Sequence, residues 1–123
     1  MKHLLLIDDN PIDLMIHEKL ARRMWGEASR VVKKTSGLEA LFYLDQCEEL
    51  PEVTFLDIKM PEMDGFGFVN ALRQRPFAGK LPIFLVSSSI DPADKQKAEE
   101  DPLVSGFLEK PLSLGQLERQ VVN

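Results

Sequence analysis

The sequence has a single cysteine and no long apolar run, and each absence excludes a class of protein. Cys47 is the one cysteine in 123 residues, which excludes an internal disulfide and a zinc site built from several cysteines. The longest apolar runs, Leu4 to Ile7 and Ile83 to Val86, are far shorter than the ~20 residues that a membrane-spanning helix needs. The amino terminus leads directly into the first run and then into an acidic pair, unlike a secretory signal peptide. We therefore expect a cytoplasmic protein.

Basic residues are also in deficit. Fifteen Lys and Arg against twenty Asp and Glu give a formal net charge of -5, so the chain lacks the basic footprint of a nucleic-acid-binding protein. Hydrophobic residues make up 44% of the chain and charged residues 28%, an ordinary balance for a globular protein. The length is typical of one domain, so we expect a single domain over residues 1–123 that binds neither nucleic acid nor membrane directly.

Short apolar clusters alternate with helical patterns along the whole chain. Unbroken apolar runs of this length are typical of strands buried on both faces of a sheet. The predicted strands are residues 4–7, 31–32, 53–56, 82–86 and 106–108, and the predicted helices are 11–24, 37–47, 66–75, 92–101 and 114 to the carboxyl terminus. Connections between successive strands are too long for hairpins, so we predict a doubly wound α/β fold, (βα)5, with helices on both faces of a parallel sheet.

Capping signals mark where several helices begin. Asn10 before a proline is typical of an N-cap followed by the first helical residue. Ser36 with Glu39, and Ser113 with Gln116, match the capping box, in which two side chains satisfy each other's backbone amides.

Apolar spacing predicts which side of the first helix is buried. Ile12, Ile16 and Leu20 recur every four residues, so we expect them to form the buried stripe of this helix. His17 lies between these positions and is expected at the surface or its boundary. Cys47, in the second helical pattern, is expected to be a buried structural thiol.

Chemically active side chains follow four of the five predicted strands. Asp8 and Asp9 follow the first strand, Asp57 the third, Ser87 the fourth and Lys110 the fifth. Ligands of an open α/β sheet bind outside the carboxyl ends of its strands. We therefore expect these side chains, far apart in the sequence, to meet at one edge of the sheet.

This set of side chains indicates phosphoryl chemistry. Three carboxylates held together repel one another unless a cation intervenes. Mg2+ suits the site, because it prefers oxygen ligands and often bridges carboxylates to a phosphate. Lys110 supplies a mobile positive charge and Ser87 a hydroxyl, and both can bind a phosphoryl oxygen. Together these groups predict a phosphoryl-transfer site in which an aspartate can be the nucleophile.

With these motifs, essentially the whole chain resembles the receiver domains of two-component response regulators. The resemblance rests on Asp8-Asp9, the stretch from Asp57 to Gly65, Ser87 and Lys110-Pro111, with their spacing. It implies a flavodoxin-like sheet with strand order 2-1-3-4-5, as in single-domain chemotaxis regulators. It also implies a signalling phosphoacceptor, not an enzyme, whose partners are a sensor histidine kinase or phosphotransfer protein and a downstream protein target.

The resemblance assigns a phosphoacceptor and a set of magnesium ligands. Asp57 would accept the phosphoryl group from a phosphohistidine or a small phosphodonor. Asp9 and Asp57 would bind Mg2+ directly, the main-chain carbonyl of Lys59 would be a third protein ligand, and Asp8 would act mainly through water.

The resemblance also assigns the groups that bind and sense the phosphoryl group. Lys110 and the Ser87 hydroxyl would bind phosphoryl oxygens, with help from the Ser88 backbone amide. The Lys110–Pro111 peptide bond would be cis. Phe107 would be the switch residue, whose ring swings inward when Ser87 turns toward the phosphoryl group and so rearranges the surface near the last helices. The alternative is that Phe107 is simply a core residue.

Two other interpretations of the same residues stay open. A degenerate receiver would bind partners without being phosphorylated, although all the site residues are present. A Mg2+-dependent phosphohydrolase would use Asp57 as nucleophile, but such enzymes usually place an aspartate two residues later as general acid/base, and Lys59 occupies that position. The chain is compatible both with a stand-alone receiver and with the receiver portion of a longer protein.

Overall fold

Five parallel strands form one sheet in the order β2-β1-β3-β4-β5, which confirms the predicted order. The computed structural model describes residues 2–89 and 91–122. The strands are β1 (His3–Ile7), β2 (Arg30–Lys34), β3 (Val53–Asp57), β4 (Ile83–Ser87) and β5 (Gly106–Glu109). After β2 forms on one side of β1, the chain crosses back and adds β3, β4 and β5 on the other side. The strands β1 and β3 therefore lie side by side at the topological switch point.

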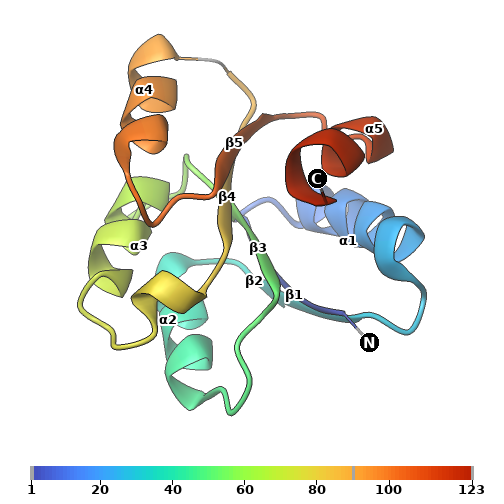
Figure 1. Cartoon of the computed structure of the whole chain (residues 1–123), viewed down its shortest axis with the longest axis horizontal. Helices are drawn as coiled ribbons and strands as arrows, with labels where there is room; N and C mark the ends of the chain where they lie inside the picture. The colour runs from blue at the N-terminus through green and yellow to red at the C-terminus, as the bar shows by residue number, and fades with distance from the viewer. Residues whose placement is uncertain (1, 90, 123) are drawn as a thin grey trace.

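Helices cover both faces of the sheet. They are α1 (Pro11–Trp25), α2 (Gly37–Gln46), α3 (Gly65–Leu72), α4 (Pro92–Glu100) and α5 (Leu114–Leu117), with a 3-10 turn at Ala78–Lys80 and a π-helical segment at Glu118–Val122. Figure 1 shows α1 and α5 on one side of the sheet and α2, α3 and α4 on the other. This arrangement confirms the predicted flavodoxin-like α/β fold. Within the described residues, no helix combines the length and the apolar character needed to cross a membrane.

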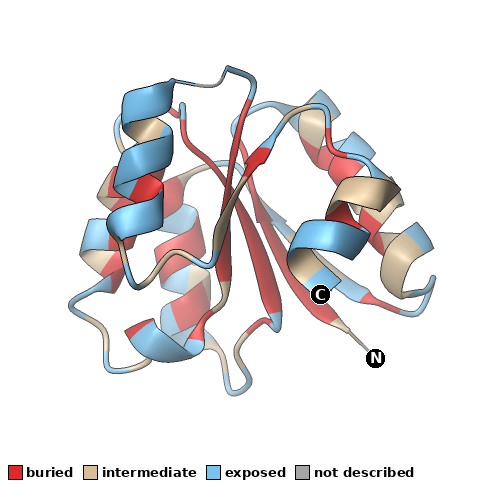
Figure 2. Ribbon diagram, turned by 45° about the horizontal axis from the view of Figure 1, so that its top comes forward, coloured by how far each residue is buried: buried red, intermediate tan, exposed pale blue. Residues whose placement is uncertain are grey.

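Alternating residues of the strands build two separate cores. Along β1, Leu5 and Ile7 pack in the cluster that includes α2 and α3, whereas Leu4 and Leu6 pack in the cluster that includes α1 and α5. Every residue of β1, β3 and β4 is buried, and Figure 2 shows these strands as the buried centre of the molecule. Each fully buried leucine contributes about 2 kcal/mol of hydrophobic stabilisation. The double burial explains why these strands are made mostly of apolar residues, with Thr54 as the one polar residue inside them.

The helix caps follow the sequence signals, with one exception. The capping box of Ser113 and Gln116 is complete. At the start of α2, the Ser36 hydroxyl accepts a hydrogen bond from the Glu39 backbone amide at 3.2 Å, as predicted. The Glu39 carboxylate, however, accepts hydrogen bonds from the hydroxyls of Thr35 (2.7 Å) and Ser36 (3.3 Å) instead of closing the box. A second hydroxyl next to the cap competes for that carboxylate.

The predicted buried stripe of α1 was wrong at two of its three positions, whereas Leu20 is partly buried and packs against the core. Ile12 and Ile16 are 61% and 42% exposed. The buried residues of α1 are Leu14, His17 and Ala21, so the prediction that His17 lies at the surface was also wrong. This helix has apolar residues on more than one side, and the side that includes the small Ala21 packs against the sheet. Apolar spacing alone does not choose between such sides.

Three smaller differences concern residues near helix ends. Cys47 is only partly buried, because it is the C-cap of α2 and lies next to an exposed loop. The third helix ends at Leu72 instead of residue 75, and Arg75 bonds back to Leu72 in a tighter turn before Pro76. The last helix is regular for one turn and then becomes π-helical up to Val122; the predicted continuation to Asn123 lies outside the described residues.

Candidate functional site

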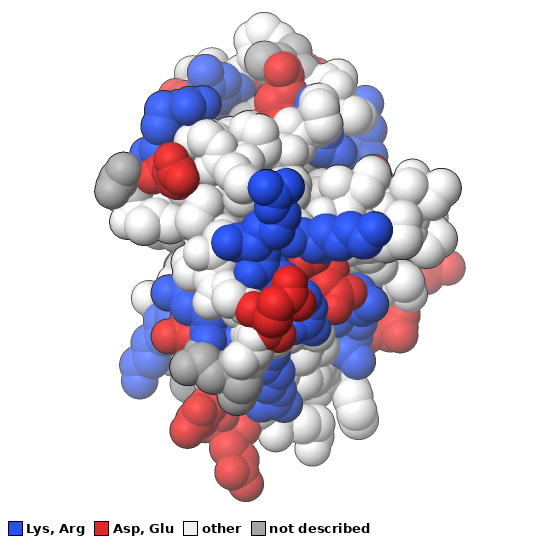
Figure 3. Space-filling model, turned by 90° about the vertical axis from the view of Figure 1, so that its right-hand side faces the viewer, with Lys and Arg blue, Asp and Glu red and all other residues white. Residues whose placement is uncertain are grey.

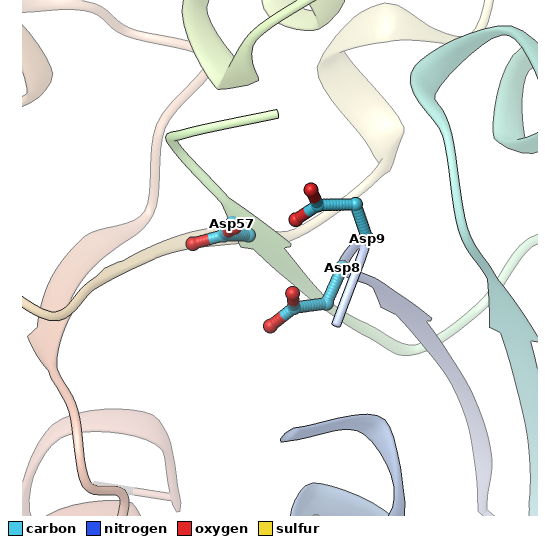
Figure 4. A group of neighbouring side chains, drawn as sticks. All are labelled: Asp8, Asp9 and Asp57. Atoms are coloured by element: carbon cyan, nitrogen blue, oxygen red, sulfur yellow. The ribbon is translucent and has the colours of Figure 1, made fainter. Parts of the chain in front are cut away.

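Three aspartates meet at the carboxyl ends of β1 and β3. Asp57 is the last residue of β3, and Asp8 and Asp9 directly follow β1. One carboxylate oxygen from each lies within 4.8 Å of the others. Figure 4 shows the three side chains leaving the two adjacent strand ends and extending into the same space. Asp8 and Asp57 are buried, whereas Asp9 is exposed. The strand topology thus brings together carboxylates that are almost 50 residues apart in sequence.

Lys110 reaches this cluster from the end of β5. Its ammonium donates hydrogen bonds to Asp8 Oδ2 and Asp13 Oδ2, both at 2.9 Å, and lies 3.4 Å from Asp57 Oδ1. The lysine side chain is 13% exposed, so its charge is largely shielded from solvent. The Lys110–Pro111 peptide bond is cis.

The pKa of Asp57 differs from that of an ordinary surface carboxylate because of the charges and burial around it. Burial and the neighbouring charge of Asp8 raise the pKa of Asp57 to about 6, against the opposing effect of Lys110. Burial alone would lower the pKa of Lys110, but its hydrogen bonds to Asp13 and Asp8 outweigh burial and raise that pKa above its ordinary value. At neutral pH the site therefore holds an ionised aspartate and a charged lysine side by side.

Ser87, at the end of β4, is buried, and its hydroxyl is engaged with the chain that follows. The hydroxyl donates to the Ser89 carbonyl oxygen at 2.8 Å and accepts from the Ser89 amide at 3.3 Å. Ser88 is exposed and lines a cavity of about 290 Å³ together with Lys110 and Pro111. Phe107 is partly buried and packs against the core on the α4 side of the sheet.

The loop from β3 to α3 approaches the site closely. The Gly65 amide donates to the Ile58 carbonyl oxygen at 2.8 Å, and a Cβ on Gly65 would lie 2.9 Å from the main-chain oxygen of Asp57. Only glycine permits this approach without displacing the end of β3. Lys59 is exposed in this loop, two residues after Asp57.

Two residues near the site were not predicted from the sequence. Asp13, in the first turn of α1, shares Lys110 with Asp8, and His17, one turn later, lines the same cavity as Lys110. Burial and the charge of Lys110 lower the pKa of His17. The signal for Asp13 was present: α1 begins directly after the acidic pair, so its first turn lies at the same edge of the sheet.

The donor set fits a hard divalent cation. The cluster offers three carboxylate oxygens from Asp8, Asp9 and Asp57, and the one lysine beside them offsets only one of their charges. Magnesium and similar cations prefer oxygen ligands of this kind, and the exposed position of Asp9 leaves the site open to water and ligands. The fold and the site together define a doubly wound α/β protein with a cluster of three aspartates at its strand ends.

Comparison with known protein families identifies the family to which this α/β protein belongs. The family model for the response regulator receiver domain matches residues 4–122. The chain therefore belongs to the response regulator receiver family, whose members are the receiver domains of two-component signalling.

Solved structures agree with this assignment. A two-component response regulator from Cytophaga hutchinsonii superposes with a TM-score of 0.88 at 28% identity, covering 98% of this chain and 93% of that one. The chemotaxis protein CheY4 of Vibrio cholerae superposes with a TM-score of 0.80 at 25% identity, covering 98% and 99% of the two chains.

Curated relatives differ greatly in length. The chain is 29% identical over 109 residues to the sensor histidine kinase CheAY of Helicobacter pylori, covering 89% of this chain but 13% of that protein. It is 32% identical over 121 residues to an uncharacterized 14.6 kDa protein of Leptolyngbya boryana, covering 96% of this chain and 86% of that protein. The chain thus spans only a small part of the kinase and most of the short relative.

Proposed function

We propose that this chain is a phosphorylation-controlled receiver whose phosphoacceptor is Asp57. The observation that supports this most directly is the position of the Asp57 carboxylate. It is buried at the end of a central strand, between two further aspartates and the ammonium of Lys110. A pKa of about 6 leaves it ionised, and so nucleophilic, at neutral pH.

The proposed phosphoryl transfer is a simple exchange of bonds. An oxygen of Asp57 forms a bond to phosphorus while the bond between phosphorus and a histidine nitrogen of the donor breaks, and the imidazole leaves with that electron pair. The product is an acyl phosphate, which water later hydrolyses to restore the carboxylate. The protein is thereby a phosphoacceptor that assists its own phosphorylation and dephosphorylation, and not an enzyme with a separate substrate.

Mg2+ is the cofactor proposed for this transfer. Asp9 and Asp57 are its direct ligands, Asp8 acts mainly through water, and the main-chain carbonyl of Lys59 completes the set. Bound Mg2+ supplies positive charge that offsets both the carboxylates and the incoming phosphoryl oxygens. The presence of Asp8, Asp9 and Asp57 oxygens within 4.8 Å of one another supports this role.

Lys110, Ser87 and Ser88 are the groups proposed to bind the phosphoryl oxygens. Lys110 already lies 3.4 Å from Asp57, so a small movement brings its ammonium to a phosphoryl oxygen. The Ser87 hydroxyl first has to leave the Ser89 main chain. Its departure makes room for Phe107 to move inward, and this movement alters the surface around β5 and α4.

The proposed partners are a sensor histidine kinase or phosphotransfer protein in the cytoplasm and a downstream protein target. Residues 1–123 are proposed to act as one domain, with no direct contact to nucleic acid or membrane. Figure 3 shows acidic and basic side chains interspersed on the face of the molecule that carries α1 and α5. A mixed surface of this kind suits recognition of another protein.

The test is incubation with acetyl phosphate, with and without Mg2+, followed by intact mass measurement. The expected result is a Mg2+-dependent gain of one phosphoryl group in the wild type, absent from Asp57→Asn. Asp94→Asn, which removes an aspartate from the first turn of α4, is the matched control and should be phosphorylated like the wild type.

A short-lived phosphoryl group is distinguished by beryllofluoride, a stable mimic of an aspartyl phosphate. Binding of beryllofluoride without detectable phosphorylation indicates rapid hydrolysis. Absence of both identifies a degenerate receiver and refutes the proposal. Phosphorylation of Asp57→Asn to the wild-type level would show that another residue is the acceptor.

A further inference from the structure

The aspartate in the first turn of α1 has a contact that the proposed phosphoryl transfer does not use. Asp13 Oδ2 accepts a hydrogen bond from the Lys110 ammonium at 2.9 Å, as short as the bond to Asp8 and shorter than the 3.4 Å approach to Asp57. Asp13 is not a member of the three-carboxylate cluster that could hold a cation. Its side chain is 29% exposed and lines the cavity on the α1 side of Lys110.

The Lys110 ammonium can donate only three hydrogen bonds. An ammonium has three N–H donors, and in this structure Asp8 and Asp13 each take one at short distance. The third donor remains for a phosphoryl oxygen on Asp57, whose carboxylate is 3.4 Å from the ammonium. The ammonium can approach that oxygen only as far as its bonds to Asp8 and Asp13 allow. Asp8 lies in the cation cluster, whereas the Asp13 carboxylate has no such role, so its bond is the one that holds the ammonium back from a phosphoryl oxygen.

We propose that Asp13 is a positioning residue that holds Lys110 on the α1 side of the site in the unphosphorylated state. In that position the ammonium leaves Asp57 more accessible to a cation, and it has to lengthen or break its bond to Asp13 to move onto a phosphoryl oxygen when Asp57 is modified. Asp13 thus favours cation binding and opposes phosphoryl binding. This inference rests on the proposed function, because it concerns the lysine that binds the phosphoryl group.

Removal of the Asp13 charge should therefore change two affinities in opposite directions. In Asp13→Asn, Lys110 turns toward Asp8 and Asp57, where its charge competes with Mg2+. We expect the dissociation constant for Mg2+ to rise threefold to tenfold. At saturating Mg2+, the dissociation constant for beryllofluoride should fall threefold to tenfold, because the ammonium is free to bind it. A merely structural role for Asp13 would weaken both.

The chain contains a matched control for the effect of a charge at a helix start. Asp94 occupies the same place in α4 that Asp13 occupies in α1: each follows a cap residue, a proline and one further residue. Among the described residues, no ion pair involves Asp94. Asp94→Asn should therefore leave both dissociation constants within twofold of the wild type.

A second variant separates contact with Lys110 from a long-range effect of charge. In a Lys110→Gln background, Asp13→Asn should change the Mg2+ dissociation constant by less than twofold, because the residue through which Asp13 acts is gone. Both constants are measured by calorimetric titration of the intact chain, with urea denaturation curves to show that each variant is folded.

The outcomes distinguish this inference from the proposed function. Opposite changes in the two constants, with an unaffected Asp94→Asn control, support the role of Asp13. Unchanged constants, parallel weakening, or an undiminished effect in the Lys110→Gln background overturn it. If the wild type itself binds no beryllofluoride, the proposed function fails, whereas the Mg2+ measurements still decide whether Asp13 acts through Lys110.

Discussion

Replacement of Asp57 by asparagine is expected to make the metal-free protein more stable at neutral pH. The folded state raises the pKa of Asp57 from 3.8 to about 6, because the carboxylate is buried next to Asp8. Each unit of pKa shift corresponds to about 1.4 kcal/mol. The ionised carboxylate therefore destabilises the folded state by about 3 kcal/mol, and Asn removes this cost while Lys110 keeps its bonds to Asp8 and Asp13.

The pH dependence of this difference gives the sharper test. Because the folded-state pKa is raised, the protonated acid favours folding at low pH, and this contribution is lost as the pH rises through about 6. Linkage gives a wild-type deficit of about 3 kcal/mol at pH 7.5 and about half of that at pH 5. The lowered pKa values of His3 and His17 have the opposite effect near pH 6, but both proteins contain them, so they cancel in the difference.

Urea denaturation of both proteins in a metal chelator, at pH 7.5, 6.5 and 5, measures this difference directly. A variant that is equally stable at pH 7.5, or an advantage that stays constant between pH 7.5 and 5, would refute the electrostatic argument. Excess Mg2+ at pH 7.5 should then stabilise the wild type more than the variant and narrow the gap, since only the wild type has the full set of carboxylates.

Three further predictions concern the scaffold. Thr54→Val should raise the free energy of unfolding in urea by about 1 kcal/mol, because the buried Thr54 hydroxyl has no hydrogen-bond partner among the described residues; a loss of stability would show that it has one. Gly65→Ala should cost about 1–3 kcal/mol in the same assay, since a Cβ would lie 2.9 Å from the backbone of Asp57 and Ile58; a neutral result would show that the loop can move aside. Hydrogen exchange should be at least tenfold faster in α4, where only Ala98 is buried, than in α3, which has five buried residues; equal rates would contradict this.

Much of the fold was predictable because local and long-range signals agree. The strands buried on both faces are made mostly of apolar residues, and each α-helix follows a residue whose side chain caps it. The right-handed crossover rule then restricts the topology. The meeting of Asp8, Asp57 and Lys110 follows from that topology alone, since all three lie at strand ends.

The sequence could not predict which partners the side chains choose. Lys110 has several carboxylates within reach, and its bond to Asp13 joins residues 97 positions apart in the chain. Likewise, Ile12 and Ile16 look like a core stripe by spacing, yet the packing of α1 buries His17 instead. Such choices depend on the final distances between packed elements, which the sequence pattern does not contain.

The one hydrogen bond that the Ser87 hydroxyl can donate connects the site to the chain beyond β4. A hydroxyl donates one hydrogen bond at a time, and in this structure the recipient is the Ser89 carbonyl oxygen. An oxyanion that accepts the hydrogen bond of this hydroxyl leaves the Ser89 carbonyl oxygen without its donor, so the two hydrogen bonds exclude each other. The chain at Ser89 therefore responds to what occupies the site because one hydrogen bond changes its acceptor, without any need for the rigid core of the sheet to move.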